Sequence, residues 1–217
     1  MKCPHCLVTV FANASRTHLG QFKEGHWFLQ ITPCPSCARP IVALGFGSNF
    51  IGGNRIVSDE QLFQVYPRGS GRPPIPPEVT DQEVADDYRE ACEVFPISPK
   101  ASAALSRRCL QQLLRLRAGV KPGDLSGEIQ QILDSRTLPT HLAEAIDAIR
   151  HIGNFAAHPI KSKNTGQVMP VEPGEAEWNL DTLEGLFDFY YVQPAQLAAK
   201  RAALNQKLQA AGKPPVK

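Results

Sequence analysis

Two Cys-x-x-Cys turns constrain this sequence more than any other feature. Cys3 and Cys6 form the first turn, CPHC, and Cys34 and Cys37 form the second, CPSC, with residues 7–33 between them. A turn of this kind lets two thiolates approach one ion, and zinc prefers four such ligands in a tetrahedron. The sequence therefore predicts one structural zinc ion bound by all four cysteines. Because the four thiolates close the coordination shell, no open position for catalysis is expected at the metal.

Short runs of β-branched and aromatic residues follow each cysteine turn. The runs LVTVF, WFLQI and IVALGF are bounded by turn residues, which indicates short β-strands. A β-hairpin would bring the two turns together, and the metal would supply folding energy to about fifty residues that build little core of their own. A thioredoxin-like redox site is the alternative for either CxxC, but the βαβ context of that site is missing. Residues 1–65 are thus predicted to form a zinc ribbon, with His5 pointing to solvent.

A Pro- and Gly-rich stretch, YPRGSGRPPIPP, follows the ribbon, and the apolar periodicity then becomes helical. Residues 66–79 are predicted to be a stiff linker. Helices are expected over VADDYREACEVF, capped by Thr80 or Asp81, and over ASAALSRRCLQQLLRL, begun by Ser98 and Pro99 and ended before Gly119. Further helices are expected over residues 125–135, 138–159 and 175–208, the last bent or broken near Pro194.

The predicted fold is mainly α. It consists of a small N-terminal β zinc ribbon, a bundle of four to five helices over residues 80–195, and a basic C-terminal helix or tail over residues 196–217. On the second helix, Arg107 shares a face with leucines and is expected to be half buried and paired with Asp87 or Glu90, whereas Arg108 is expected on the solvated face.

Charge is distributed unevenly along the chain. Residues 1–77 contain seven Lys/Arg and three Asp/Glu, residues 78–194 contain eleven and eighteen, and residues 195–217 contain five and none. This pattern favours polyanion contacts through the ribbon or the tail. No run reaches the roughly 20 apolar residues of a membrane helix, and the N-terminus lacks a secretory pattern, so a cytoplasmic protein without membrane contact is expected.

A polar stripe lies beside the apolar face of the segment AIDAIRHIGNFAAHP. Arg150, Asn154 and His158 are spaced by four residues and therefore line up on one side of a helix. One interpretation is structural: His158 binds free carbonyl groups at the end of the helix, Asn154 satisfies backbone groups, and Arg150 pairs with Asp147. The other interpretation is a candidate catalytic site.

The segments SPKASAALSRRCLQQLL and IRHIGNFAAHP, followed by a helix that ends near YY, resemble a bacterial family of uncharacterised function in the HEPN superfamily. The resemblance covers roughly residues 80–195, and CPHC and CPSC fit the zinc-ribbon variants of this family. Related domains occur alone, behind a zinc ribbon, or attached to restriction and other defence proteins. Active HEPN proteins are metal-independent ribonucleases that dimerise and combine an Arg and a His from each chain in one site.

The resemblance implies roles for the polar stripe. His158 would transfer a proton at the ribose 2′-hydroxyl or the leaving oxygen, Arg150 would stabilise the phosphate charge, and Asn154 would orient one of them. The sequence departs from the usual motif, because Gly153 and not Arg stands directly before Asn154, and Arg150 lies one turn too early.

Two functions from different classes follow. The first is a non-catalytic module that binds RNA or a protein partner through the ribbon or the tail. The second is an endoribonuclease that acts as a homodimer through the helical bundle. The acidic balance of residues 78–194 favours the binding module, and the resemblance supports the enzyme.

Overall fold

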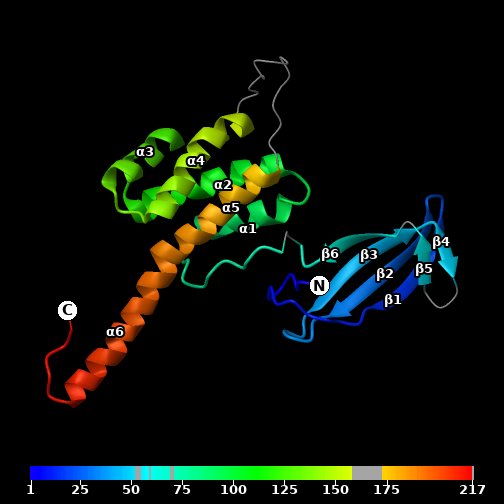
Figure 1. Ribbon diagram of the computed structural model, residues 1–217, viewed down its shortest axis with the longest axis horizontal. Coiled ribbons are helices and arrows are strands. Elements are labelled where there is room, and N and C mark those ends of the chain that lie inside the picture. The colour runs from blue at the N-terminus through cyan, green and yellow to red at the C-terminus, as the bar shows by residue number, and fades with distance from the viewer. Residues whose placement is uncertain (52–54, 59, 69–70, 158–172, 217) are drawn as a thin grey trace. The chain divides into compact units, whose positions relative to one another are not determined.

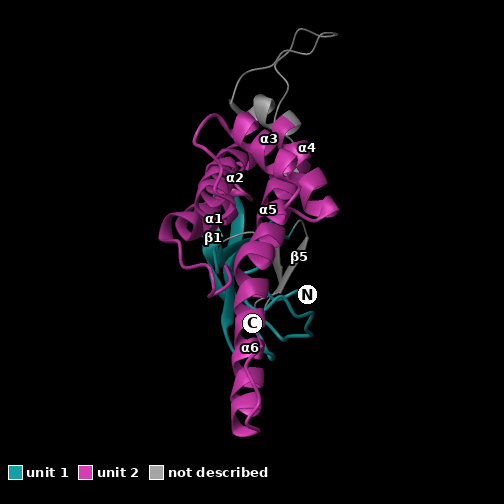
Figure 2. Ribbon diagram, turned by 90° about the vertical axis from the view of Figure 1, so that its left-hand side faces the viewer, with its two compact units in different colours: residues 1–74 teal, residues 75–217 magenta. Residues whose placement is uncertain are grey.

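The computed structural model describes residues 1–51, 55–58, 60–68, 71–157 and 173–216 (Figure 1). The chain divides into two compact units, Met1–Pro74 and Ile75–Lys217 (Figure 2). The first unit is built from β-strands and the second from helices. None of the described helices combines the length and the apolar composition that crossing a membrane requires.

The first unit contains a four-stranded antiparallel sheet in the order β1-β2-β3-β6. The strands are β1 (Ser15–Phe22), β2 (Gly25–Pro33), β3 (Pro40–Gly47) and β6 (Gln61–Tyr66). A second, two-stranded sheet joins β4 (Asn49–Ile51) to β5 (Arg55–Ser58). The strands predicted from WFLQI and IVALGF are confirmed, since they lie in β2 and β3.

One predicted strand is wrong, and strands β1, β4, β5 and β6 were not predicted. The run LVTVF forms only an isolated bridge between Thr9 and Lys2, because Leu7 turns the chain with a φ of 61°. Strand β1 was missed because its sequence, SRTHLGQF, contains few apolar residues. It pairs along β2 all the same, since β2 offers it a free edge.

The two faces of the four-stranded sheet differ. On one face Phe28 is buried against Gly45, where a Cβ atom would come within 1.9 Å of the Phe28 ring. The guanidinium of Arg16 lies 4.7 Å from the centre of that ring and binds Glu60 at 2.7 Å. The register places seven apolar residues on the opposite face, and all of them remain partly or largely exposed: Trp27, Leu29, Ile31, Val42, Leu44, Phe46 and Phe63.

The second unit is a helical bundle. Its elements are α1 (Gln82–Val94), α2 (Pro99–Leu113), the π-helical turn η1 (Leu114–Ala118), α3 (Leu125–Ser135), α4 (Thr140–Ala157), α5 (Pro173–Phe187), the π-helical segment η2 (Asp188–Val192) and α6 (Gln193–Ala210). Apolar residues from α1 to α5, η1 and η2 form one buried core. The predicted starts are confirmed: Asp81 precedes α1, and Ser98 caps α2 by accepting a hydrogen bond from the Ala101 amide at 3.2 Å.

Of the two alternatives predicted near Pro194, a bend or a break, the break is wrong. Helix α5 passes through η2 into α6 without leaving helical conformation, as the φ and ψ angles of Phe187, Val192 and Gln193 show. Pro194 stands in the first turn of α6, directly after the π-helical segment. The ring of a proline clashes with the carbonyl four residues earlier in a regular α-helix. The wider π-helical turns before Pro194 change that local geometry, so the chain continues as a helix.

Candidate functional site

The two cysteine turns have the same backbone geometry. The amide of Leu7 donates to the Cys3 carbonyl at 2.9 Å, and the amide of Ala38 donates to the Cys34 carbonyl at 2.8 Å. Leu7 and Ala38 both adopt left-handed backbone conformations, with φ of 61° and 58°. A left-handed residue after the second cysteine reverses the chain, so the two thiols of each turn face one point. The second turn lies in the hairpin between β2 and β3.

The four sulfur atoms form a compact cluster. Cys3 and Cys37 have their Sγ atoms 3.9 Å apart, as do Cys6 and Cys34, and all four atoms lie within 4.8 Å of one another. A tetrahedral ion with zinc–sulfur bonds of about 2.3 Å places its ligands about 3.8 Å apart. A disulfide needs a separation of about 2.05 Å, so none is formed. The cluster therefore fits a four-coordinate metal ion.

The electrostatics of the thiols also fit a cation. The backbone amide of Cys37 lowers the pKa of the Cys34 thiol below its ordinary value. For Cys37, the amide of Arg39 also favours ionisation, yet burial and the thiols of Cys34, Cys6 and Cys3 raise its pKa to about 11. Four thiolates at these distances repel one another. Because a central cation offsets that repulsion, full ionisation is favourable only with a metal present.

The cluster is partly shielded from solvent. Cys3 and Cys34 are buried, with Val10 and Ile41 packed beside them. His5 departs from the prediction, since its ring does not simply point to solvent. Its Nε2 atom lies 2.8 Å from the carbonyl oxygen of Pro40, a contact that links the first cysteine turn to β3.

Arg150 is already engaged by neighbouring side chains. Its guanidinium lies 2.7 Å from Asp147 on the same helix, which confirms the predicted pair, and it also binds Gln130 of α3. Asn154 falls within α4, but its side chain and all of His158 lie outside the described residues. The structure thus gives surroundings for one of the three stripe residues, and those surroundings are structural contacts.

The expected burial is confirmed, since Arg107 is half buried and Arg108 is exposed, but the expected carboxylate partner of Arg107 is wrong. The carboxylate of the buried Asp87 is bound by Arg108, although the Arg108 side chain is 60% exposed. Arg107 donates instead to the Ile149 carbonyl at 2.8 Å, and burial lowers its pKa. An arginine can carry its charge from a solvated position to a buried acid because its stem is long.

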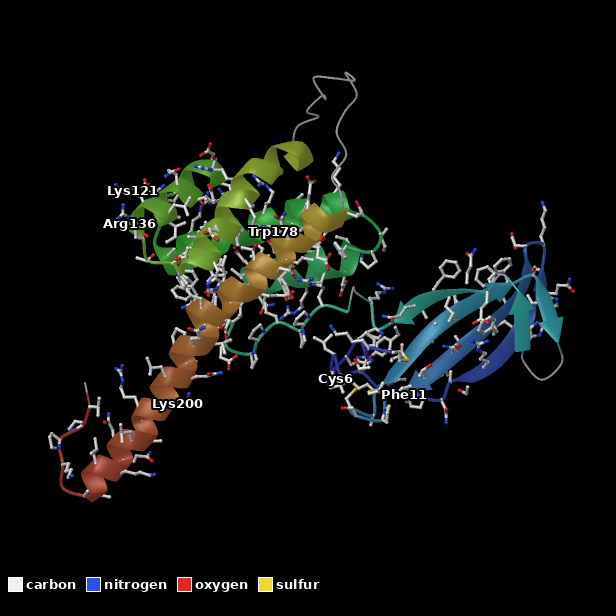
Figure 3. All side chains as sticks on the ribbon, viewed as in Figure 1. Cys6, Phe11, Lys121, Arg136, Trp178 and Lys200 are labelled. Atoms are coloured by element: carbon white, nitrogen blue, oxygen red, sulfur yellow. The ribbon has the colours of Figure 1, made fainter. Side chains whose placement is uncertain are left out.

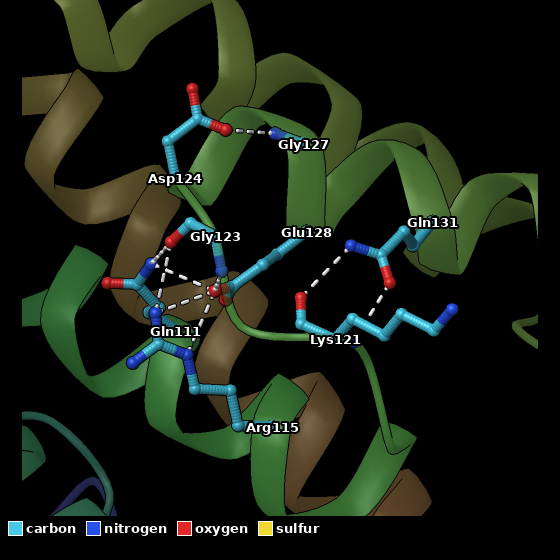
Figure 4. Close-up of polar contacts among 8 residues, drawn as sticks. All are labelled: Gln111, Arg115, Lys121, Gly123, Asp124, Gly127, Glu128 and Gln131. Carbon is cyan, nitrogen blue, oxygen red and sulfur yellow. Dashed lines mark hydrogen bonds and ion pairs between the residues drawn. The ribbon is translucent and has the colours of Figure 1, made fainter.

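Glu128 is a buried carboxylate that the sequence did not single out. Its Oε1 atom accepts hydrogen bonds from Arg115 at 2.6 and 2.9 Å, from the Gly123 amide at 2.7 Å and from Gln111 at 3.2 Å (Figure 4). These contacts hold the loop before α3 against α2 and η1. Glu128 looked like an acidic residue in the first turn of a helix, and only its tertiary partners show that it is a structural centre.

Asp81 links the two ends of the helical unit. Its Oδ2 atom accepts from Tyr191 at 2.8 Å and from Arg117 at 2.6 Å, and Arg117 also stacks on the Tyr191 ring at 4.3 Å. Desolvation acts to raise the pKa of the Asp81 carboxyl, but the hydrogen bonds from Tyr191 and Arg117 outweigh it and lower the pKa. Desolvation and the contact with Asp81 outweigh the effect of Arg117 and raise the pKa of Tyr191 to about 12.

Comparison with known proteins gives one match. A family model described as a domain of unknown function (DUF4145) matches residues 89–207, from within α1 to near the end of α6. No curated protein and no solved structure matches the chain. The matched segment covers more than half of the 217 residues. The chain therefore belongs to the family of the domain of unknown function DUF4145.

Proposed function

We propose that this protein is a zinc-binding, non-catalytic module that recognises a nucleic acid or a protein, with a HEPN-like helical domain and a role in defence or stress response. The observation that carries the proposal is the cluster of four cysteine sulfur atoms within 4.8 Å. Four thiolates favour zinc among the common cellular metals, and they leave it no position for substrate. Zinc would therefore hold the ribbon together and take no part in a reaction. Free thiols of this kind fit the reducing cytoplasm.

The open face of the four-stranded sheet supports a binding role. Trp27 and Phe46 have ring centroids 5.5 Å apart, and the ring of Phe63 on β6 stacks with Trp27 at a centroid distance of 6.5 Å. Phe63 is 48% exposed. Aromatic rings in a row can stack with unpaired bases or fill the pockets of a protein partner. The excess of seven basic over three acidic residues in residues 1–77 favours a nucleic acid.

An alternative is a dimeric, metal-independent endoribonuclease with Arg150, Asn154 and His158 as catalytic residues. The resemblance to HEPN proteins supports it. In that case His158 would move the proton of the attacking 2′-hydroxyl, and Arg150 would neutralise the phosphate. The ion pair of Arg150 with Asp147 at 2.7 Å argues against this role, because the charge is already compensated.

Direct binding tests the module. Fluorescence anisotropy with labelled single-stranded RNA of mixed sequence would compare the zinc-loaded wild type with Phe63→Ala. Loss of one stacked base is expected to weaken binding about 5- to 100-fold. Phe11→Ala is the matched control, because Phe11 is fully exposed and lies outside the strands. Equal binding by both variants would remove the sheet face from the proposal.

Cleavage separates the two functions. The same RNA is incubated with the wild type and with His158→Ala at equal zinc content, without added divalent metal. The binding module predicts intact RNA in both samples. Cleavage by the wild type that is lost in His158→Ala would establish the ribonuclease instead.

A further inference from the structure

Helix α6 has no buried residue, unlike the core helices of its unit. Leu197 and Leu204 on this helix are 57% and 46% exposed. The helix continues from α5 through η2, so residues 173–210 form one uninterrupted rod whose last part extends beyond the bundle (Figure 1). The C-terminal segment returns to α6 at Asn205, whose Oδ1 accepts from the Val216 amide at 2.8 Å. Most helix stability in proteins comes from tertiary packing of one face, which the exposed leucines of α6 lack within this chain. The family match extends to residue 207, so most of α6 belongs to the matched domain.

Charges along this rod are arranged in a particular order. Asp181 and Asp188 are exposed and stand seven residues apart before Pro194. Lys200 and Lys207 are exposed and stand seven residues apart after it. Seven residues make almost two turns, so each pair lies on one face with its charges about 10.5 Å apart. The acidic half and the basic half of the rod therefore carry charges at the same spacing.

This order is self-complementary in an antiparallel pair. With a two-fold axis at Pro194, Lys200 of one rod lies opposite Asp188 of the other, because each stands six residues from Pro194. Lys207 lies opposite Asp181 in the same way, because each stands thirteen residues from Pro194. A two-fold axis then repeats both contacts on the other side. Four Asp–Lys pairs follow from one operation.

The acidic and basic pairs share one side of the rod. In a regular α-helix the twelve residues from Asp188 to Lys200 make about three and a third turns. Segment η2 is π-helical, and its wider turns reduce this value toward three full turns. Asp188 and Lys200 therefore lie close to one line along the rod. By their spacing of three and four residues, Leu197 and Leu204 flank Lys200, and Trp178, which is 45% exposed, flanks Asp181.

We propose that two copies of this chain associate through their α5–α6 rods, antiparallel, with Asp181 and Asp188 of one copy facing Lys207 and Lys200 of the other. This interface goes beyond the proposed function, which does not require a second copy of the chain. Apolar contacts come from Leu197, Leu204 and Trp178, and the alanines of α6 allow the two backbones to approach closely. The charges fix the antiparallel direction and the register.

Charge complementarity favours a second copy over a polyanion. A nucleic acid would match the basic half of the rod but would be repelled by Asp181 and Asp188. A second copy places opposite charges beside both halves at once. Within one chain the basic half points beyond the bundle, where Lys200 lies in Figure 3.

The test is sedimentation velocity of the full, zinc-loaded chain across a concentration series. The wild type is expected to dimerise. Two double variants, Lys200→Asp with Lys207→Asp and Asp181→Lys with Asp188→Lys, are each expected to raise the dimer dissociation constant at least about 10-fold. The variant with all four changes restores opposite charges across the interface. Its dimer dissociation constant is expected to lie within about 3-fold of the wild-type value. All four positions are exposed, so circular dichroism should show unchanged helix content.

Glu83→Lys with Glu90→Lys is the matched control. It makes the same charge change on exposed residues seven positions apart, but on α1, and should leave the dimer intact. A monomeric wild type, a dimer that survives both reversed pairs, or failure of the fourfold variant to dimerise would each overturn the interface. Loss of RNA binding in the Lys200/Lys207 variant, without a change of mass, would assign α6 to a polyanion and overturn it too. RNA binding that depends on Phe63 in a monomeric wild type would refute the interface and leave the binding module standing.

Discussion

The Nε2 atom of His5 lies 2.8 Å from the carbonyl oxygen of Pro40, and this contact ties the first cysteine turn to the strand that follows the second. The ring of Tyr66, at the end of β6, lies 5.4 Å from the His5 ring. The two cysteine turns are thus joined by a side chain that is not itself a metal ligand. Contacts of this kind orient metal sites from outside the ligand set.

Replacing His5 is therefore expected to weaken metal binding without abolishing it. His5→Ala removes the link to Pro40 but leaves all four thiols, so zinc affinity should fall about 10-fold. Competition with a chromogenic chelator measures this affinity. His26→Ala is a control, because that histidine belongs to the same sheet but contacts His18, away from the cysteine turns. An unchanged affinity in His5→Ala would show that the contact has no part in holding the site.

Removing the metal is expected to unfold the strand unit and spare the helical one. The core of the cysteine region consists of Cys3, Val10, Cys34 and Ile41, too few apolar residues to fold without a metal. Cys34→Ser should lose most bound zinc by elemental analysis and lose the dispersed amide signals of residues 1–51. Cys92→Ala, a cysteine of α1, should retain one zinc ion per chain. Loss of the helical signals together with the signals of the strand unit would show that the two units fold as one.

Glu128 is expected to be the most sensitive polar position of the helical unit. In Glu128→Ala the Gly123 amide and Gln111 lose their acceptor, whereas Arg115 can still reach solvent. The free energy of unfolding should fall by about 2 to 3 kcal/mol, measured by urea denaturation.

The matched control for Glu128 is Gln131, which lies on the same helix and contacts the same loop. Gln131 holds both backbone groups of Lys121, at 2.8 and 3.1 Å, but is exposed (Figure 4). Gln131→Ala should therefore cost less than about 1 kcal/mol. Similar losses in both variants would argue that the loop, and not the buried carboxylate, carries the stability.

Asp81 gives the helical unit a pH dependence of known sign. Tyr191 and Arg117 lower the pKa of Asp81 in the folded state. The ionised Asp81 therefore adds to the free energy of unfolding above its unfolded-state pKa, and this stabilisation is lost as pH falls through the folded-state pKa. Asp81→Asn should flatten the acid side of the stability curve, with an effect at neutral pH below about 1 kcal/mol because the group is partly exposed. Urea denaturation from neutral to acidic pH measures the change. An equally steep acid limb in Asp81→Asn would assign the dependence to other carboxylates.

Local sequence was sufficient for most helix boundaries. Asp81, Ser98 and Gly119 are cap residues, and cap chemistry acts within a few residues of the chain. Local sequence failed at Pro194, where the effect of the proline depends on the π-helical turns that precede it.

The cysteine spacing alone identified the candidate metal site, because two Cys-x-x-Cys turns are the usual way in which four thiolates are brought around one ion. The partners of charged side chains were decided only by the tertiary structure. Arg107 and Arg108 are neighbours in sequence with similar chemistry, and the packing of α2 against α1 and α4 settles which one reaches Asp87. Glu128 shows the same limit, because its partners come from α2, η1 and the loop before α3. Periodicity and spacing specify local conformation, whereas the pairing of buried charges depends on distances between segments that meet only when the chain is folded.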